Sequence, residues 1–194
     1  MKAEGKSKKI FVYLMALVIG ILAVDILYTK SLCHKARLTN QNIIDRFQQI
    51  FYKSMVWDKS SWAEVPCLQN PCDMWSMQEI ISEIKPDFIV ETGTYKGGSS
   101  LFYAMVLAQV NPNGKVITVD IEPLVKKAAD YAIFQDRVER IIGDSVSVEV
   151  IEAIQKKIGS AAKVLVTLDS LHTKKHVLKE LELYSQLVSV GSYL

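Results

Sequence analysis

Short apolar runs alternate with stretches of helical periodicity from about residue 76 to residue 194. Four of the runs read as strands, at residues 88–91, 115–120, within 137–144, and 163–169. Helical patterns cover residues 74–84, 99–110, 123–134, 148–158 and 174–187, and residues 191–194 read as the start of a fifth strand. This alternation predicts an α/β fold, an open parallel sheet with helices on both faces. Ligands bind such sheets beyond the carboxyl ends of the strands.

The N-terminal region has a different pattern, since residues 10–28 are nearly all apolar and carry a single charge, Asp25. A helix of this length matches a hydrocarbon layer of ~30 Å. We therefore expect a single-pass N-terminal membrane anchor. Four preceding lysines favour a cytosolic N-terminus, but basic residues also follow the segment, so the side of the membrane stays open. A cleaved signal peptide is the alternative, although the apolar stretch is long for one.

Residues 31–75 read as short helices and loops. Apolar residues at helical intervals in 42–57 predict an amphipathic helix packed on the core. The loop at residues 60–75 contains two prolines and two tryptophans and is long for a passive connection. It is either a flap over a site or an irregular segment pinned by buried tryptophans. The expected organisation is thus a tail and anchor (1–30), a lid segment (31–75) and a core domain (76–194).

Composition narrows the function classes. Apolar residues make up 49% of the 194-residue chain and charged residues 23%, which is typical of a globular protein. The formal net charge of +2 is too small to indicate a nucleic-acid partner. Three cysteines show no metal-binding spacing. Cys67 and Cys72 are either a disulfide in an oxidising compartment or two free thiols.

The first strand-to-helix turn, FIVETGTYKGGSS, has an unusually bare backbone. It lacks the lysine of a P-loop and the middle glycine of a dinucleotide loop. The remaining pattern, an acid at Glu91 followed by Gly93, Gly97 and Gly98, suits a ligand with a cationic amino-acid part. Glu91 would face the ammonium and sulfonium charges, and a helix N-terminus capped by Ser99 would face the carboxylate. A turn with only a structural role is the alternative.

Two further acids end the next two strands. Asp120 can accept both hydroxyls of a ribose, and Asp144, with Ser145 beside it, can meet an adenine edge. Each alone could equally be a helix N-cap. Together with Glu91 they outline an adenosine with a charged tail, which is S-adenosylmethionine.

The fourth strand ends at Asp169, where the substrate would lie beside the methyl donor. A carboxylate there can hold Mg²⁺ and lower the pKa of a substrate hydroxyl. His172 could be a base or could support the metal ligand. His172 and His176 are four residues apart, so a zinc pair is conceivable, but no third ligand is nearby in the sequence. The alternative is a turn-forming aspartate and a solvent-facing histidine.

Several motifs, in order and in spacing, resemble the cephalosporin hydroxylase / rhamnosyl O-methyltransferase family. They run from about Trp62 to the C-terminus and read SWAEVP, NPCDMWSMQEII, KPDFIVETGTYKGGSSLFYA, VITVDIEP, GDS and LDSLHTKKHVLKELELYS. The resemblance implies a Rossmann-like, class I S-adenosylmethionine-dependent methyltransferase fold and a Mg²⁺ ligand at Asp169. It implies cofactor contacts at Glu91, Gly93, Thr94, Gly97, Gly98, Ser99, Asp120, Asp144 and Ser145.

In that family an acidic pair after the fifth strand completes the metal site, and two more strands close the sheet. The sequence ends at Leu194, inside the predicted fifth strand, so we expect a C-terminally truncated domain with an incomplete magnesium site. The expected reaction is methyl transfer to a hydroxyl of a sugar, a glycolipid or a related small molecule. The alternative is a catalytically incomplete cofactor-binding or interaction module anchored in a membrane. Homo-oligomerisation stays open.

Overall fold

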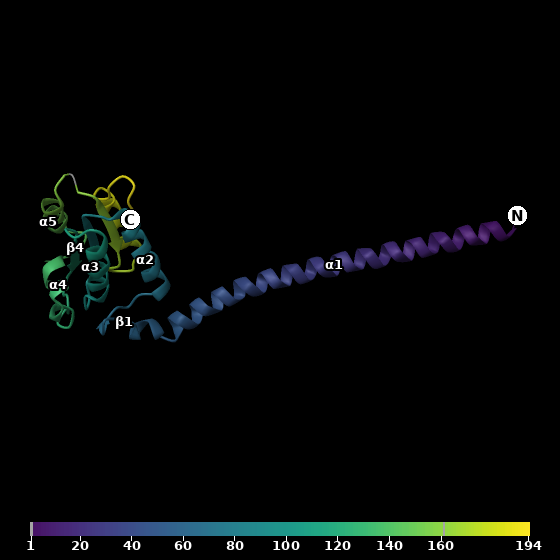
Figure 1. Ribbon diagram of the computed structural model, residues 1–194, viewed down its shortest axis with the longest axis horizontal. Coiled ribbons are helices and arrows are strands. Elements are labelled where there is room, and N and C mark those ends of the chain that lie inside the picture. The colour runs from purple at the N-terminus through teal and green to yellow at the C-terminus, as the bar shows by residue number, and fades with distance from the viewer. Residues whose placement is uncertain (1, 161) are drawn as a thin grey trace. The chain divides into compact units, whose positions relative to one another are not determined.

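The computed structural model describes the backbone of residues 2–160 and 162–194, and divides the chain into two compact units, Met1–Ser54 and Met55–Leu194 (Figure 1). In the first unit the side chains of residues 2–14, 16–18 and 34–40 are not described.

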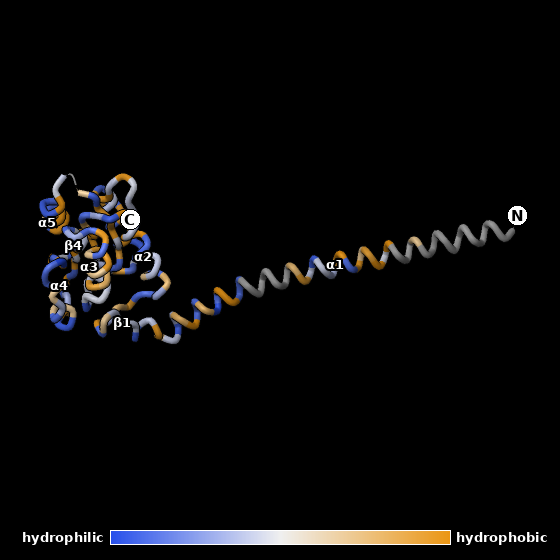
Figure 2. Tube along the Cα trace, in the orientation of Figure 1, coloured by the Kyte–Doolittle hydropathy of each residue, from blue (hydrophilic) through white to orange (hydrophobic). Residues whose placement is uncertain are grey.

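The first unit is one continuous helix, α1 (Lys2–Lys53). This differs from the predicted short helices and loops after residue 31. Its described part carries two apolar stretches (Figure 2), and their large side chains are exposed: Ile19, Ile21, Leu22, Val24, Ile26 and Leu27 in one, Ile43, Ile44, Phe47 and Ile50 in the other. The second stretch lies in residues 42–57, the segment that the sequence predicted to form an amphipathic helix packed on the core.

The predicted membrane anchor finds no support in the part of the chain that the structure describes. No helix there combines the length and the apolar character that a bilayer crossing requires. The predicted anchor, residues 10–28, is described only in part, because the side chains of residues 10–14 and 16–18 lie outside the described structure.

The second unit is built around a parallel sheet of four strands in the order β5-β4-β3-β6. The strands are β3 (Phe88–Thr92), β4 (Lys115–Asp120), β5 (Val138–Ile142) and β6 (Val164–Leu168). Phe88 aligns with Lys115 of β4 on one side and with Val164 of β6 on the other. The parallel α/β sheet predicted from the alternating pattern is confirmed.

Helices cover both faces of this sheet, as predicted. They are α2 (Pro71–Ile84), α3 (Gly98–Val110), α4 (Ala132–Arg137), α5 (Val148–Ile158) and α6 (Lys174–Tyr184). Successive strand residues point to opposite faces. Ile89 therefore belongs to a core cluster shared with α2, α3 and α4, whereas Val90 belongs to a second cluster shared with α5 and α6.

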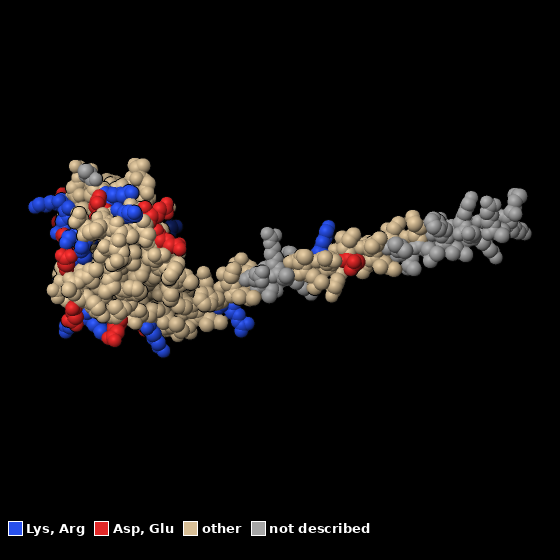
Figure 3. All heavy atoms as spheres, in the orientation of Figure 1, with Lys and Arg blue, Asp and Glu red and all other residues tan. Residues whose placement is uncertain are grey.

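Short elements precede and link these layers. A 3₁₀ turn, η1 (Val56–Lys59), leads into an antiparallel pair, β1 (Ser61–Trp62) and β2 (Val65–Pro66). A second 3₁₀ turn, η2 (Ala128–Asp130), precedes α4. Basic and acidic side chains are interspersed over the visible face of this unit (Figure 3).

Three expectations about these elements were wrong. The helix predicted at residues 123–134 is an irregular segment followed by η2 and α4, because the Leu124 N–H bonds to the Tyr95 carbonyl, 2.7 Å away, outside any helix. Gly97, with φ 80°, precedes α3 in place of the predicted serine cap. Residues 191–194 form no strand in the described structure, although the Tyr193 carbonyl accepts a hydrogen bond from the Val166 N–H of β6 at 3.1 Å.

Candidate functional site

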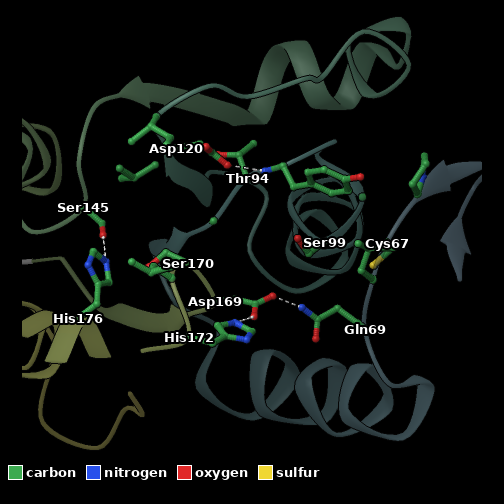
Figure 4. A pocket seen from close by; sticks show the side chains of 18 of the residues that line it. Cys67, Gln69, Thr94, Ser99, Asp120, Ser145, Asp169, Ser170, His172 and His176 are labelled. Carbon is green, nitrogen blue, oxygen red and sulfur yellow. Dashed lines mark hydrogen bonds and ion pairs between the residues drawn. The ribbon is translucent and has the colours of Figure 1, made fainter. Parts of the chain in front are cut away.

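A cavity of about 570 Å³ opens at the carboxyl ends of β3, β4, β5 and β6. The loops after these strands form its floor, and residues 66–69, from the last residue of β2 onward, form one wall (Figure 4). The loop at residues 60–75 therefore contributes to a site. Neither of its tryptophans is buried, since Trp62 is 37% exposed and Trp75 is 68% exposed. This excludes the alternative in which buried tryptophans pin the loop.

The glycine turn allows other parts of the chain to approach closely. Gly93 has φ 91°, and a Cβ there would lie 2.0 Å from the Asp169 carbonyl oxygen. A Cβ on Gly98 would lie 2.2 Å from the Pro66 carbonyl oxygen. Gly93 and Gly98 line the cavity, whereas Gly97 is not among the lining residues. The bare backbone thus has a structural reason besides any ligand.

Glu91 does not line the cavity, contrary to the prediction that it faces a cationic ligand. It is 1% exposed, and its carboxylate accepts hydrogen bonds from the hydroxyls of Ser99, Ser100 and Thr118. Desolvation by burial raises its pKa to about 7, while these three hydrogen bonds oppose the increase. Ser99 donates to Glu91 instead of capping α3, although it also lines the cavity.

Asp120 ends β4 and lines the cavity, as predicted. Its Oδ2 accepts the Tyr95 N–H at 2.7 Å and its Oδ1 accepts the Glu122 N–H at 3.0 Å. The carboxylate thus fixes the turn after β3 against the turn after β4. Nearby, the hydroxyls of Thr94 and Thr118 lie 2.7 Å apart, so Thr94 also ties these two strands together.

Asp144 and Ser145 follow β5, and both line the cavity. Asp144 is exposed and accepts the Val146 N–H at 3.1 Å, so it also stabilises a turn. The Ser145 hydroxyl lies 3.0 Å from His176 Nε2 and donates to Glu180 Oε1 at 2.6 Å. The sequence analysis missed Glu180, which is 1% exposed and also accepts a hydrogen bond from Ser170. The spacing of His176 and Glu180, four residues apart on α6, was the available signal.

Asp169, just after β6, contacts one residue of its own loop and one residue of a distant segment (Figure 4). Its Oδ1 lies 2.9 Å from His172 Nε2, and its Oδ2 accepts a hydrogen bond from the Gln69 side-chain amide. Desolvation by burial raises the Asp169 pKa, while the bonds from His172 and Gln69 oppose the increase. No pattern in the sequence indicated Gln69, which lies in the loop before α2.

The histidines of the conceivable zinc pair have different partners. His172 contacts Asp169, whereas His176 contacts Ser145 and Glu180. The described residues contain no group of three or more His, Cys, Asp or Glu side chains that could hold a metal ion. Cys67 and Cys72 are both unpaired.

Comparison with known proteins identifies the family. The model of the rhamnosyl O-methyltransferase/CmcI family matches residues 54–194. A rhamnosyl O-methyltransferase of Mycobacterium leprae is 34% identical over 154 residues, which are 79% of this chain and 66% of that protein. One from Mycobacterium tuberculosis is 31% identical over 157 residues, which are 78% of this chain and 62% of that protein. The chain therefore spans slightly less than two thirds of the length of these relatives.

Solved structures agree on the fold. A CmcI structure with Mg-SAM aligns with a TM-score of 0.50 and 16% identity, covering 64% of this chain and 51% of that one. This likeness matches the α/β methyltransferase architecture expected from the motifs. With the family model matched over 54–194, the chain belongs to the rhamnosyl O-methyltransferase/CmcI family.

Proposed function

We propose that the chain is an S-adenosylmethionine-dependent O-methyltransferase that acts on a hydroxyl of a sugar, a glycolipid or a related small molecule. The observation that carries the proposal is the cavity at the carboxyl edge of the sheet, where Asp120, Asp144 and the first residues of α3 meet. Membership of the rhamnosyl O-methyltransferase/CmcI family supports the same reaction class.

The polar groups around the cavity suit the parts of this cofactor. Asp120 uses one lone pair on each oxygen for the N–H groups of Tyr95 and Glu122, so lone pairs remain for two ribose hydroxyls. Asp144, on the neighbouring strand end, is exposed and can meet the adenine. The first turn of α3, which contributes Gly98 and Ser99, offers N–H groups to the cofactor carboxylate.

His172 is the proposed acceptor of the substrate proton. When bound, S-adenosylmethionine supplies an electrophilic methyl group on a sulfonium. The acceptor hydroxyl must lose a proton as its oxygen takes that methyl. Asp169 favours the His172 tautomer with the proton on Nε2, which leaves Nδ1 free to accept the hydroxyl proton. Gln69 holds the other carboxylate oxygen of Asp169 and so helps to fix the imidazole.

The described residues do not fit a complete magnesium site. Asp169 has the oxygen ligands that Mg²⁺ prefers, but no group of three candidate ligands surrounds it in the described part of the chain. The proposed proton transfer therefore contains no metal-dependent step.

Calorimetric titration with S-adenosylmethionine, followed by a methyl-transfer assay on rhamnosides, tests the proposal. We expect binding and turnover in the wild type, and an affinity at least tenfold lower in Asp120→Ala, because the ribose loses its acceptor. Asp136→Ala is the matched control, since Asp136 is exposed and pairs only at the surface with Lys115 and Arg137.

Equal affinity in Asp120→Ala and Asp136→Ala would contradict the cofactor site. Because Asp120 also holds two backbone N–H groups, the thermal midpoint of each variant is measured, and the affinities are compared below both midpoints. Binding without turnover of any hydroxyl acceptor would favour the alternative function, a cofactor-binding module.

We further propose that residues 10–28 anchor the chain in a membrane. The support for this is the hydropathy of the sequence, which has 19 residues with Asp25 as the single charge.

A further inference from the structure

A second cavity, of about 360 Å³, adjoins the first one. Its walls come from residues 60–71, from α2 and from α3. The lining is mainly apolar: Trp62, Pro71, Met74, Trp75, Phe102 and Val106, with the polar side chains of Gln69 and Gln78 among them. A cavity with this mixture is suited to an apolar group that carries a few hydrogen-bonding atoms.

The two cavities share two lining residues, Cys67 and Gln69. Gln69 donates its side-chain amide to Asp169, the residue that contacts His172. Cys67 is 6% exposed, and burial raises its thiol pKa to about 12, so this shared wall is uncharged near neutral pH. The second cavity is therefore separated from the first one by an uncharged wall, and Gln69 in that wall connects through Asp169 to the proposed proton acceptor, His172.

The two tryptophans of this cavity are held differently. The Trp62 ring packs edge-on against Phe102, with centroids 4.9 Å apart, and its indole N–H points to Met105 Sδ at 3.1 Å. Trp75 lies on α2 and is 68% exposed. A fixed indole and an open one thus form an aromatic surface that a ligand would cover.

We propose that the second cavity binds the apolar group of a glycoside acceptor, so that the sugar hydroxyl attached to it reaches into the first cavity. This inference rests on the proposed function, because it assigns the acceptor of that same reaction. The preferred acceptor is an alkyl or aryl glycoside, not a free sugar. Each methylene fully buried against the tryptophans would strengthen binding by about fourfold.

The test compares methyl and hexyl rhamnoside as probes, each titrated by calorimetry into the full chain saturated with S-adenosylmethionine. We expect hexyl rhamnoside to bind at least tenfold more tightly than methyl rhamnoside. Trp75→Ala is expected to remove most of this difference and to leave the affinity for S-adenosylmethionine unchanged. The control is Leu178→Ala, which removes a half-exposed apolar side chain from α6, outside both cavities.

The titration with the cofactor separates the two proposals. If the wild type fails to bind S-adenosylmethionine, the proposed function is wrong and this inference falls with it. If the cofactor binds but the two rhamnosides bind equally, or neither binds, only the acceptor assignment is wrong. An equal effect of Trp75→Ala and Leu178→Ala on hexyl rhamnoside would also overturn it.

Discussion

Glu91 is a carboxyl group placed where water does not reach. An isolated carboxylate at 1% exposure would be costly, and the hydroxyls of Ser99, Ser100 and Thr118 offset part of that cost. Two of these hydroxyls belong to the first turn of α3 and the third belongs to β4. Glu91 therefore joins three elements beneath the cavity, which is a structural role in place of the predicted ligand contact.

The raised pKa of Glu91 predicts how stability depends on pH. The ordinary pKa of 4.5 becomes about 7 in the folded chain. Between these values the folded state keeps a proton that the unfolded state has lost, so the free energy of unfolding falls as pH rises through this window. A shift of this size corresponds to about 3 kcal/mol. Urea unfolding at pH 5 and pH 8 measures the difference.

Glu91→Gln is the matched variant for this prediction. An amide can still accept and donate within the ring of three hydroxyls, but it does not titrate. The variant is expected to lose most of the stability difference between pH 5 and pH 8. If the variant keeps the full stability difference between pH 5 and pH 8, that difference comes from other groups. The first candidate is Asp169, because burial raises its pKa as well.

Sequence reasoning located residues that end strands better than residues that reach the site from elsewhere. Asp120, Asp144 and Asp169 were found because parallel strands bring their carboxyl ends to one edge. Glu91 lies near the carboxyl end of β3, at the same edge of the sheet, but the direction of its side chain depends on the three hydroxyls that enclose it. Gln69 could not be found, because its contact with Asp169 depends on how a loop folds back over the sheet.

The turn between β3 and α3 packs closely against other segments at two of its glycines, Gly93 and Gly98. Gly93→Ala is expected to cost more than about 3 kcal/mol, because it combines a positive φ with a Cβ placed 2.0 Å from the Asp169 carbonyl oxygen. Gly191→Ala isolates the first effect, since Gly191 has φ 80° and open space around it, and should cost about 1–2 kcal/mol. Denaturant midpoints of the two variants give the comparison. Similar losses in both would mean that the β6 turn moves aside at little cost.

The elements that could be predicted are those with strong local patterns. All four strands of the parallel sheet were found, and three of them, β3, β4 and β6, are mainly apolar runs. The sequence of β5, VERII, contains two charged residues, and the short strands β1 and β2 were not predicted. The helix α5 was found with its exact bounds, Val148–Ile158. The segment at residues 123–134 has an equally helical pattern, but the bond from Leu124 to Tyr95 holds its first residues outside any helix, and helical structure begins only at η2 and α4. Tertiary contacts of this kind are not encoded in local periodicity.

Membrane anchoring through residues 10–28 is a prediction about the complete chain. When the chain is expressed with its N-terminus intact, we expect it to stay in the membrane fraction after alkaline carbonate extraction, because the 19 residues 10–28, with Asp25 as their single charge, match the hydrocarbon thickness. A variant with two central leucines of the segment, Leu17 and Leu22, changed to arginine should move to the soluble fraction. Release of the unchanged chain by carbonate would contradict the anchor.

The hydrogen bond between Gln69 and Asp169 joins residues that are 100 positions apart. During translation, the wall formed by residues 66–69 and the glycine turn leave the ribosome long before Asp169, His172 and His176 do. A nascent chain that does not yet include His176 lacks part of the cavity lining. A nucleoside ligand therefore cannot guide the early steps of folding. The sheet therefore has to assemble through burial of its own apolar side chains, and the ligand can stabilise only a domain whose synthesis has passed into α6.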